Sequence, residues 1–205
     1  MHPDQFTLTN SLDNRVFENS VNELGYHARV LDLMELDASA KIQIHVSGAY
    51  NDKESSMIRF AERFEKLDRI VKRRLVIEND HRSYNLRDCI QTSAETGAPV
   101  LFDIFHHRVN SSGETIQEAF KLHTKTWKEK DGLPMVDYSS QKMEGKMGRH
   151  AETINLEDFR EFLDKSKPYD FDVILETKDK EASALKAVEI AAHDHRFSIA
   201  KKHAS

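Results

Sequence analysis

Five acidic or imidazole side chains stand at or near the carboxyl ends of five predicted strands. They are His45, Glu78, Asp103, Asp137 and Glu176. Two further histidines, His106 and His150, follow two of these strands in the chain. Carboxylates gathered at one edge repel one another unless cations lie between them, and mixed carboxylate and imidazole donors suit Mn, Zn or Fe. Bridging carboxylates also suit more than one ion, about 3.5 to 4 Å apart. The set therefore predicts a site for divalent metal ions.

Asp103 illustrates why chance is a poor explanation for the residues found at these strand ends. It ends the apolar run that begins at Val100, and His106 follows three residues later. Burying a carboxylate without a partner costs several kcal/mol, so an arginine or a metal ion must lie nearby. Each residue alone has a plainer reading, because a strand-terminal Asp often caps the next helix and a lone loop His is usually solvated. Five strands ending in the same way favour the metal.

Strands alternate with helices along the whole chain. The predicted strands are 41–46, 74–78, 99–103, 134–138 and 171–176, and the predicted helices are 14–36, 53–71, 85–96, 114–127, 155–166 and 179–194. A polar loop, 139–150, follows the fourth strand. This alternation indicates βαβ units and a parallel sheet, an α/β fold whose ligands bind at the carboxyl ends of the strands.

Composition narrows the class of protein. Lys and Arg number 30 against 35 Asp and Glu, a net charge of −5, which argues against nucleic-acid binding through bulk charge and leaves a local basic surface open. The single cysteine, Cys89, excludes an intrachain disulfide framework and suits a reducing compartment. No apolar segment approaches the roughly 20 residues that span a bilayer. We expect a cytoplasmic protein of one domain, residues 1–205.

Six motifs, taken together, resemble the UV damage endonuclease family, relatives of endonuclease IV. They are "HPDQF" (2–6), "IHVSG" (44–48), "VIEND" (76–80), "DIFHH" (103–107), "VDYSSQ" (136–141) and "ILETKDKE" (174–181). The resemblance implies a (β/α)8 TIM barrel with up to three metal ions at its carboxyl rim, usually manganese, with zinc or magnesium as other possibilities. It implies a DNA repair endonuclease that incises damaged double-stranded DNA immediately 5′ to a UV photoproduct, leaving a 3′-hydroxyl and a 5′-phosphate. No membrane and no obligate protein partner is expected.

The resemblance also assigns roles. His2, His45 and Glu78 would hold one ion, and Glu78 would bridge to a second ion held by Asp103 and Glu176. A third ion would lie between His106 and His150. Glu78, Asp103 and Glu176 would be the catalytic carboxylates. Gln5 and Phe6 match the pair that pushes into the duplex at the lesion, where an aromatic ring can stack.

Two departures from the family qualify this reading. Where relatives often carry Lys and His, this chain has Met135 and Asp137; Asp137 can still ligate a metal, but Met135 cannot supply any function of that lysine. About five βα units follow from the sequence where the family has eight, so we expect the C-terminal part of a barrel. In such a fragment Ile44, Ile77 and Phe102 would line a half-open trough, and His2 would be held loosely. We also expect such a fragment to be poorly soluble and nearly inactive.

The sequence leaves two alternatives to the nuclease open. The xylose isomerase-like sugar isomerases and epimerases also place His, Glu and Asp at strand ends around a divalent metal, although "HPDQF" and the second histidine cluster favour the nuclease. The remaining possibility is an inactive truncated remnant that keeps ligands but does not turn over.

Overall fold

Five short parallel strands form the centre of the fold, and each pairs with the next one in the chain. The computed structural model describes residues 1–142, 145 and 148–198. The strands are β1 Ile42–His45, β2 Leu75–Glu78, β3 Val100–Asp103, β4 Met135–Tyr138 and β5 Asp172–Leu175, in the order β1-β2-β3-β4-β5. All four pairings are parallel. The predicted α/β class and sequential parallel sheet are confirmed, and they match part of a (β/α)8 barrel wall.

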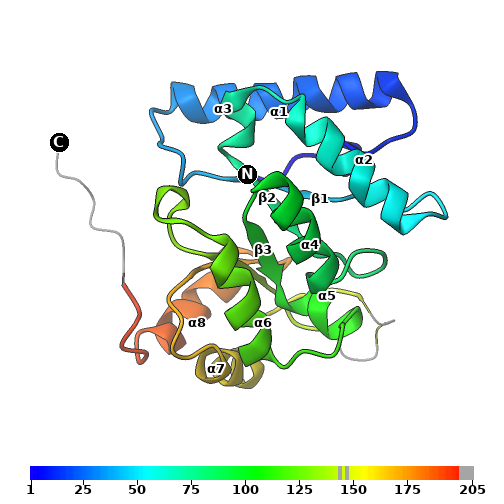
Figure 1. The fold of residues 1–205 in the computed structure, drawn as a ribbon. Helices are drawn as coiled ribbons and strands as arrows, with labels where there is room; N and C mark the ends of the chain where they lie inside the picture. The colour runs from blue at the N-terminus through cyan, green and yellow to red at the C-terminus, as the bar shows by residue number, and fades with distance from the viewer. Residues whose placement is uncertain (143–144, 146–147, 199–205) are drawn as a thin grey trace.

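Helices cover the outer face of this sheet (Figure 1). They are α1 Asn14–Leu33, α2 Lys53–Glu65, α3 Arg69–Lys72, α4 Leu86–Thr96, α5 Ile104–Val109, α6 Ile116–His123, α7 Leu156–Lys165 and α8 Glu181–Ala191, with short 3-10 turns at Thr124–Thr126 and Glu129–Asp131. Helix α1 lies against β1 at the top of the view, and α4 and α6 pack on β2 and β3. Among the described residues, every helix is too short or too polar to cross a bilayer. Residues 143–144 and 146–147 of the expected polar loop lie outside the described part.

Local sequence sets several helix boundaries. Asn85 and Asp88 form a capping box at the start of α4, and Gly97 ends that helix with φ 73°, a conformation that glycine adopts without steric penalty. The helix predicted over 53–71 is interrupted, because Asp68 is extended (φ −59°, ψ 146°) and starts α3 anew. Leu67 and Val71, on either side of this break, both lie in the core. Helix α5 was not expected, and it begins where Asp103 accepts the amide of His106.

The sheet is strongly curved. The side-chain amide nitrogen of Gln43 on β1 lies 2.7 Å from Oδ2 of Asp137 on β4. Two strands separate β1 from β4. In a flat sheet with strands about 4.8 Å apart, these residues would stand roughly 14 Å from each other. The inner face of the sheet is therefore concave, as in a barrel wall.

The two faces of the sheet carry different side chains, and the expected assignment of one set was wrong. Ile44, Ile77 and Phe102 lie on the outer face, in the main core beneath the helices. Successive side chains on a strand point to opposite faces, so an inward Glu78 and Asp103 force Ile77 and Phe102 outward. The inner apolar cluster is Val76, Leu101 and Trp127, with Met135 packed against it. Val76 and Leu101 are fully buried, so they do not line an open trough.

Candidate metal centre

Three overlapping groups of ligand atoms lie at the carboxyl rim of the strands. They are His2, His45 and Glu78; Glu78, Asp103 and His106; and Asp103, Asp137 and Glu176. Within each group the ligand atoms lie within 4.8 Å of one another. Glu78 belongs to the first two groups and Asp103 to the last two. The five strand-end residues predicted to converge are thus brought together, and the shared carboxylates have the placement that bridging ligands need.

The first group joins the amino-terminal segment to β1 and β2. Oε2 of Glu78 lies 3.5 Å from Nε2 of His2 and 3.7 Å from Nε2 of His45. His2 is not loosely held, contrary to expectation. The Met1 amine donates to the Lys41 carbonyl (2.7 Å), and the Met1 carbonyl accepts from the Gln43 amide (3.0 Å), so Met1 pairs with the edge of β1.

The second group is almost entirely buried. Nδ1 of His106 lies 3.3 Å from Oε1 of Glu78 and 3.3 Å from Oδ2 of Asp103. The other oxygen of Asp103 accepts the His106 amide at 2.7 Å, which caps α5. The end of β3, the start of α5 and the pair of candidate ligands therefore form one local structure. The spacing of three residues between Asp103 and His106 follows from this cap.

Asn79 supports this group, although its role was not predicted. Its side chain donates to the Asp103 carbonyl (2.9 Å) and accepts from the Asp103 amide (3.0 Å), so it extends the β2–β3 ladder at the rim. Its own carbonyl lies 2.9 Å from Nδ1 of His106. Such outer partners orient the ligands of metal sites. The available signal was a polar residue directly after a buried strand, beside Glu78.

The third group contains the clearest sign of an expected cation. Asp137 is fully buried, and its Oδ1 has no hydrogen-bond partner among the residues that the structure describes. A buried carboxylate oxygen without a donor is costly, whereas a metal ion would satisfy it. The neighbouring donors are carboxylates of Asp103 and Glu176. The donor set therefore fits a divalent ion, and Asp137 lies where it can ligate despite its departure from the family pattern.

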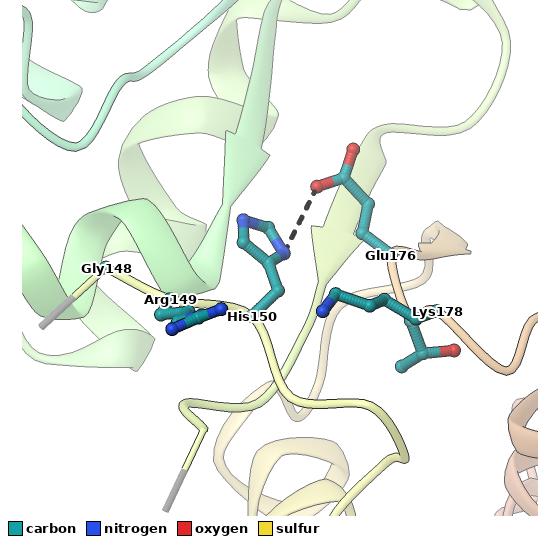
Figure 2. Close-up of a pocket in the computed structure, with 6 residues that line it drawn as sticks. Gly148, Arg149, His150, Glu176 and Lys178 are labelled. Atoms are coloured by element: carbon teal, nitrogen blue, oxygen red, sulfur yellow. Dashed lines mark ion pairs between the residues drawn. The ribbon is translucent and has the colours of Figure 1, made fainter. Parts of the chain in front are cut away.

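His150 reaches the same rim from the loop after β4. Figure 2 shows its Nδ1 directed at Oε2 of Glu176, 3.9 Å away. Its ring packs on Phe105 and lies 6.2 Å from the ring of His106, centroid to centroid. His106 is the nearer of the two to Glu78 and Asp103. The assignment of a third ion to His106 and His150 stays a prediction.

Burial and charge move the ionisation of these groups apart. Burial raises the pKa of Asp103 to about 8, with the charge of Glu78 adding to it and that of His106 opposing it. Burial, followed by the charges of Glu78 and Glu176, raises the pKa of Asp137 well above its usual value. Burial would raise the pKa of Glu78 as well, but the charge of His45 and hydrogen bonds from His106 and His2 outweigh it and lower that pKa. Without cations to neutralise them, Asp103 and Asp137 therefore tend to keep their protons.

Gln5 and Phe6, the predicted lesion-binding pair, follow His2 by three and four residues, and both are exposed, Phe6 by 72%. His81, which follows the "VIEND" motif, is half-buried, with its ring 5.3 Å from that of His106.

A hollow beside the third group carries positive charge. Gly148, Arg149, His150, Glu176, Thr177 and Lys178 line it (Figure 2). The exposed ammonium of Lys178 pairs with Glu152 at 2.8 Å, an interaction that water screens. The side chains of Arg149 and Lys178 are thus close to the candidate ligands His150 and Glu176.

A family model covers nearly the whole chain. The model of UV-endonuclease UvdE matches residues 1–202. Two curated relatives, each named UV DNA damage endonuclease, are also similar. The protein of Clostridium perfringens (strain 13 / Type A) is 37% identical over 190 residues, 92% of this chain and 46% of the relative. The protein of Bacillus mycoides (strain KBAB4) is 34% identical over 189 residues, 91% of this chain and 60% of the relative. The chain therefore spans about half to three fifths of the length of these relatives.

Solved structures agree on the fold. A crystal structure of SacUVDE is 44% identical and matches with a TM-score of 0.90 over 96% of this chain and 66% of that chain. A D-psicose 3-epimerase from Clostridium cellulolyticum H10 matches with a TM-score of 0.57 at 14% identity, over 86% of this chain and 62% of that chain. At that identity the epimerase bears on the fold alone.

Proposed function

Because the chain belongs to the UV-endonuclease UvdE family, we propose that it serves DNA repair as a metal-dependent endonuclease. Its substrate is UV-damaged double-stranded DNA. The phosphodiester immediately 5′ to the photoproduct is hydrolysed, leaving a 3′-hydroxyl and a 5′-phosphate. Manganese is the metal that we expect.

The observation that carries the proposal is the position of Glu78. Its two oxygens face different partners, Oε2 toward His2 and His45, and Oε1 toward His106. This carboxylate is 1% exposed, so its two oxygens are held by their surroundings rather than by water. Glu78 could thus bridge two divalent ions if they are bound.

The protein's residues hold and orient the reacting parts. His2, His45 and Glu78 would hold one ion; Asp103 and Glu176, with Asp137, would hold a second with Glu78; and His106 and His150 would hold a third. When bound, divalent ions supply an activated water near neutral pH and neutralise charge on the leaving oxygen. Glu78, Asp103 and Glu176 act by fixing where that chemistry takes place.

The residue that would insert at the lesion lies close to the candidate metal ligands in sequence. Phe6 is four residues from His2 and is exposed. Four extended residues reach at most about 14 Å, which is roughly four nucleotides of stacked strand. A ring of Phe6 inserted at a poorly stacked photoproduct would keep the cluster near the adjoining phosphodiester, which accounts for incision beside the lesion. Gln5 would contact the displaced bases.

Positive side chains next to the cluster suit the phosphate backbone. Arg149 and Lys178 line the hollow beside His150 and Glu176. Lys and Arg contacts to phosphates position a protein on DNA without reading sequence. A local basic surface of this kind reconciles a net charge of −5 with a DNA substrate.

Nicking of supercoiled plasmid tests the proposal. The chain is incubated with UV-irradiated or unirradiated plasmid and Mn²⁺, Mg²⁺ or Zn²⁺, with the C. perfringens relative as positive control. We expect nicking of irradiated plasmid with Mn²⁺ and its loss on chelation. An end-labelled duplex with one photoproduct then maps the cut, and extension by a polymerase reports the 3′-hydroxyl.

Three results would count against the proposal. Equal nicking of irradiated and unirradiated plasmid would remove the lesion from the function. Cleavage at another phosphodiester would contradict the 5′ position. Absence of nicking by a folded, metal-loaded chain, beside an active C. perfringens control, would favour the inactive remnant.

A further inference from the structure

Gln43 lies inside the curved sheet, between two of the ligand groups. It is 3% exposed, and its side-chain nitrogen donates to Oδ2 of Asp137 at 2.7 Å and to Oε2 of Glu78 at 3.3 Å. An amide NH₂ has two hydrogens, so one can be given to each carboxylate. The three residues come from β1, β2 and β4, and the contact exists only because the sheet is curved.

We propose that Gln43 is a positioning residue that links two metal sites and determines which carboxylate oxygen each site receives. The proposal rests on the function proposed above, since it concerns the same cluster. Gln43 is not itself a metal ligand in it, and it acts through Asp137 and Glu78.

The two oxygens of Asp137 differ in their partners. One of its oxygens, Oδ2, is taken by Gln43, and the other, Oδ1, has no partner among the described residues. Asp137 also belongs to the ligand group with Asp103 and Glu176. By holding Oδ2, Gln43 leaves Oδ1 as the oxygen available to an ion. Without that hydrogen bond the carboxylate could rotate and present either oxygen.

The same amide constrains Glu78. Oε2 of Glu78 faces His2, His45 and Gln43, while Oε1 faces His106. A donor fixed on Oε2 sets the plane of the carboxylate and so the direction of both oxygens. Gln43 thereby ties the bridge between the first two groups to Asp137 in the third.

The residue type suits this position. A lysine would reach two carboxylates but would add a positive charge that repels metal ions, and a glutamate would add a further negative charge without a donor. An aliphatic side chain would leave Oδ2 of Asp137 buried and unpaired, which is unfavourable. A glutamine supplies two neutral donors at a buried point among acids.

Manganese binding without DNA tests the inference. The variants are Gln43→Leu and Gln43→Met, which remove the donors, with Gln91→Leu on the exposed face of α4 as the control. Changing an outer partner of a metal ligand typically lowers metal affinity about 10- to 100-fold. We expect that loss for both Gln43 variants in Mn²⁺ titrations, and altered magnetic coupling between the ions in electron paramagnetic resonance spectra. Gln91→Leu should behave as the unmodified chain.

Incision provides a second comparison. At limiting Mn²⁺ the Gln43 variants should nick poorly, and high Mn²⁺ should restore nicking toward the unmodified level. Unfolding in urea, followed for every variant with chelator present, separates a loss of stability from a loss of metal affinity. Mn²⁺ titrations and spectra that superimpose on those of the unmodified chain would overturn the inference.

If both variants fail to fold, a measurement on the unmodified chain tests the role of Gln43. The side-chain amide resonances of Gln43 should shift when diamagnetic Zn²⁺ is titrated in, and those of Gln91 should not. No difference between the two amides would overturn the inference. A chain that binds Mn²⁺ but never nicks would refute the proposed function, while the role of Gln43 would still be decided by metal affinity.

Discussion

The side chain of Asn79 pairs reciprocally with the backbone of Asp103. It donates to the Asp103 carbonyl at 2.9 Å and accepts from the Asp103 amide at 3.0 Å. The regular β2–β3 pairing ends one residue earlier on β2, at Glu78. The amide thus continues the ladder beyond the last paired residues, and it holds Asp103 beside Glu78 at the rim.

Replacing Asn79 should weaken both stability and metal binding. Asn79→Ala leaves the buried amide and carbonyl of Asp103 without partners, at about 1 to 3 kcal/mol. We also expect a loss of about 10- to 100-fold in Mn²⁺ affinity, because Asp103 loses its anchor. Urea unfolding and Mn²⁺ titration check the two effects, with Asn22→Ala on the exposed face of α1 as control. Unchanged Mn²⁺ affinity would show that Asn79 serves the fold alone.

Glu78→Gln should abolish incision. The substitution keeps the shape of the side chain but removes the charge that a bridging ligand must supply. Metal content of the purified chain and nicking of irradiated plasmid are measured together, and Glu189→Gln on α8 is the exposed control. Nicking at the unmodified rate would remove Glu78 from the site.

Phe6→Ala should weaken discrimination between damaged and intact DNA more than it slows cleavage of a bound lesion. Stacking on an aromatic ring contributes about 1 to 3 kcal/mol per base, so we expect the affinity ratio to fall by about 5- to 150-fold. Binding to duplexes with and without a photoproduct, and single-turnover cleavage, separate the two effects. Tyr26→Ala, an exposed aromatic on α1, is the control. An unchanged affinity ratio would contradict a role in lesion reading.

The metal-free chain should lose stability as the pH rises from about 6.5 to 9. Asp103 has a pKa of about 8 in the folded chain against an ordinary 3.8, raised chiefly by burial. Burial would lower the pKa of His106, but Glu78 and Asp103 outweigh it and raise that pKa to about 9 from 6.5. Both folded-state values exceed the unfolded ones, so the folded chain binds more protons and its stability falls as those protons leave.

The size of this pH effect can be measured directly. From these two groups together we expect the free energy of unfolding, with chelator present, to fall by on the order of 5 kcal/mol between pH 6.5 and 9. Asp103→Asn and His106→Gln should each flatten the dependence. Stability that rises over this interval in the metal-free chain would contradict the prediction.

Much of the fold follows from local sequence. The alternation of apolar strands with amphipathic helices, the Asn85 cap and the Gly97 stop are short-range signals, and the structure follows each of them. The convergence of His45, Glu78 and Asp103 was equally accessible, because parallel strands necessarily place their carboxyl ends at one edge.

The tertiary structure decided the rest, since curvature of a sheet is not a property of any one segment. The direction of curvature determines which face of each strand lies inside the concave surface. It places Ile44, Ile77 and Phe102 under the helices instead of in the interior. Curvature alone brings Gln43 to Asp137 across 94 residues of chain. The role of Asn79 likewise depends on a partner strand at hydrogen-bonding distance. Residue types and spacing identify which side chains can ligate a metal; only packing in three dimensions determines which atoms hold those ligands in place.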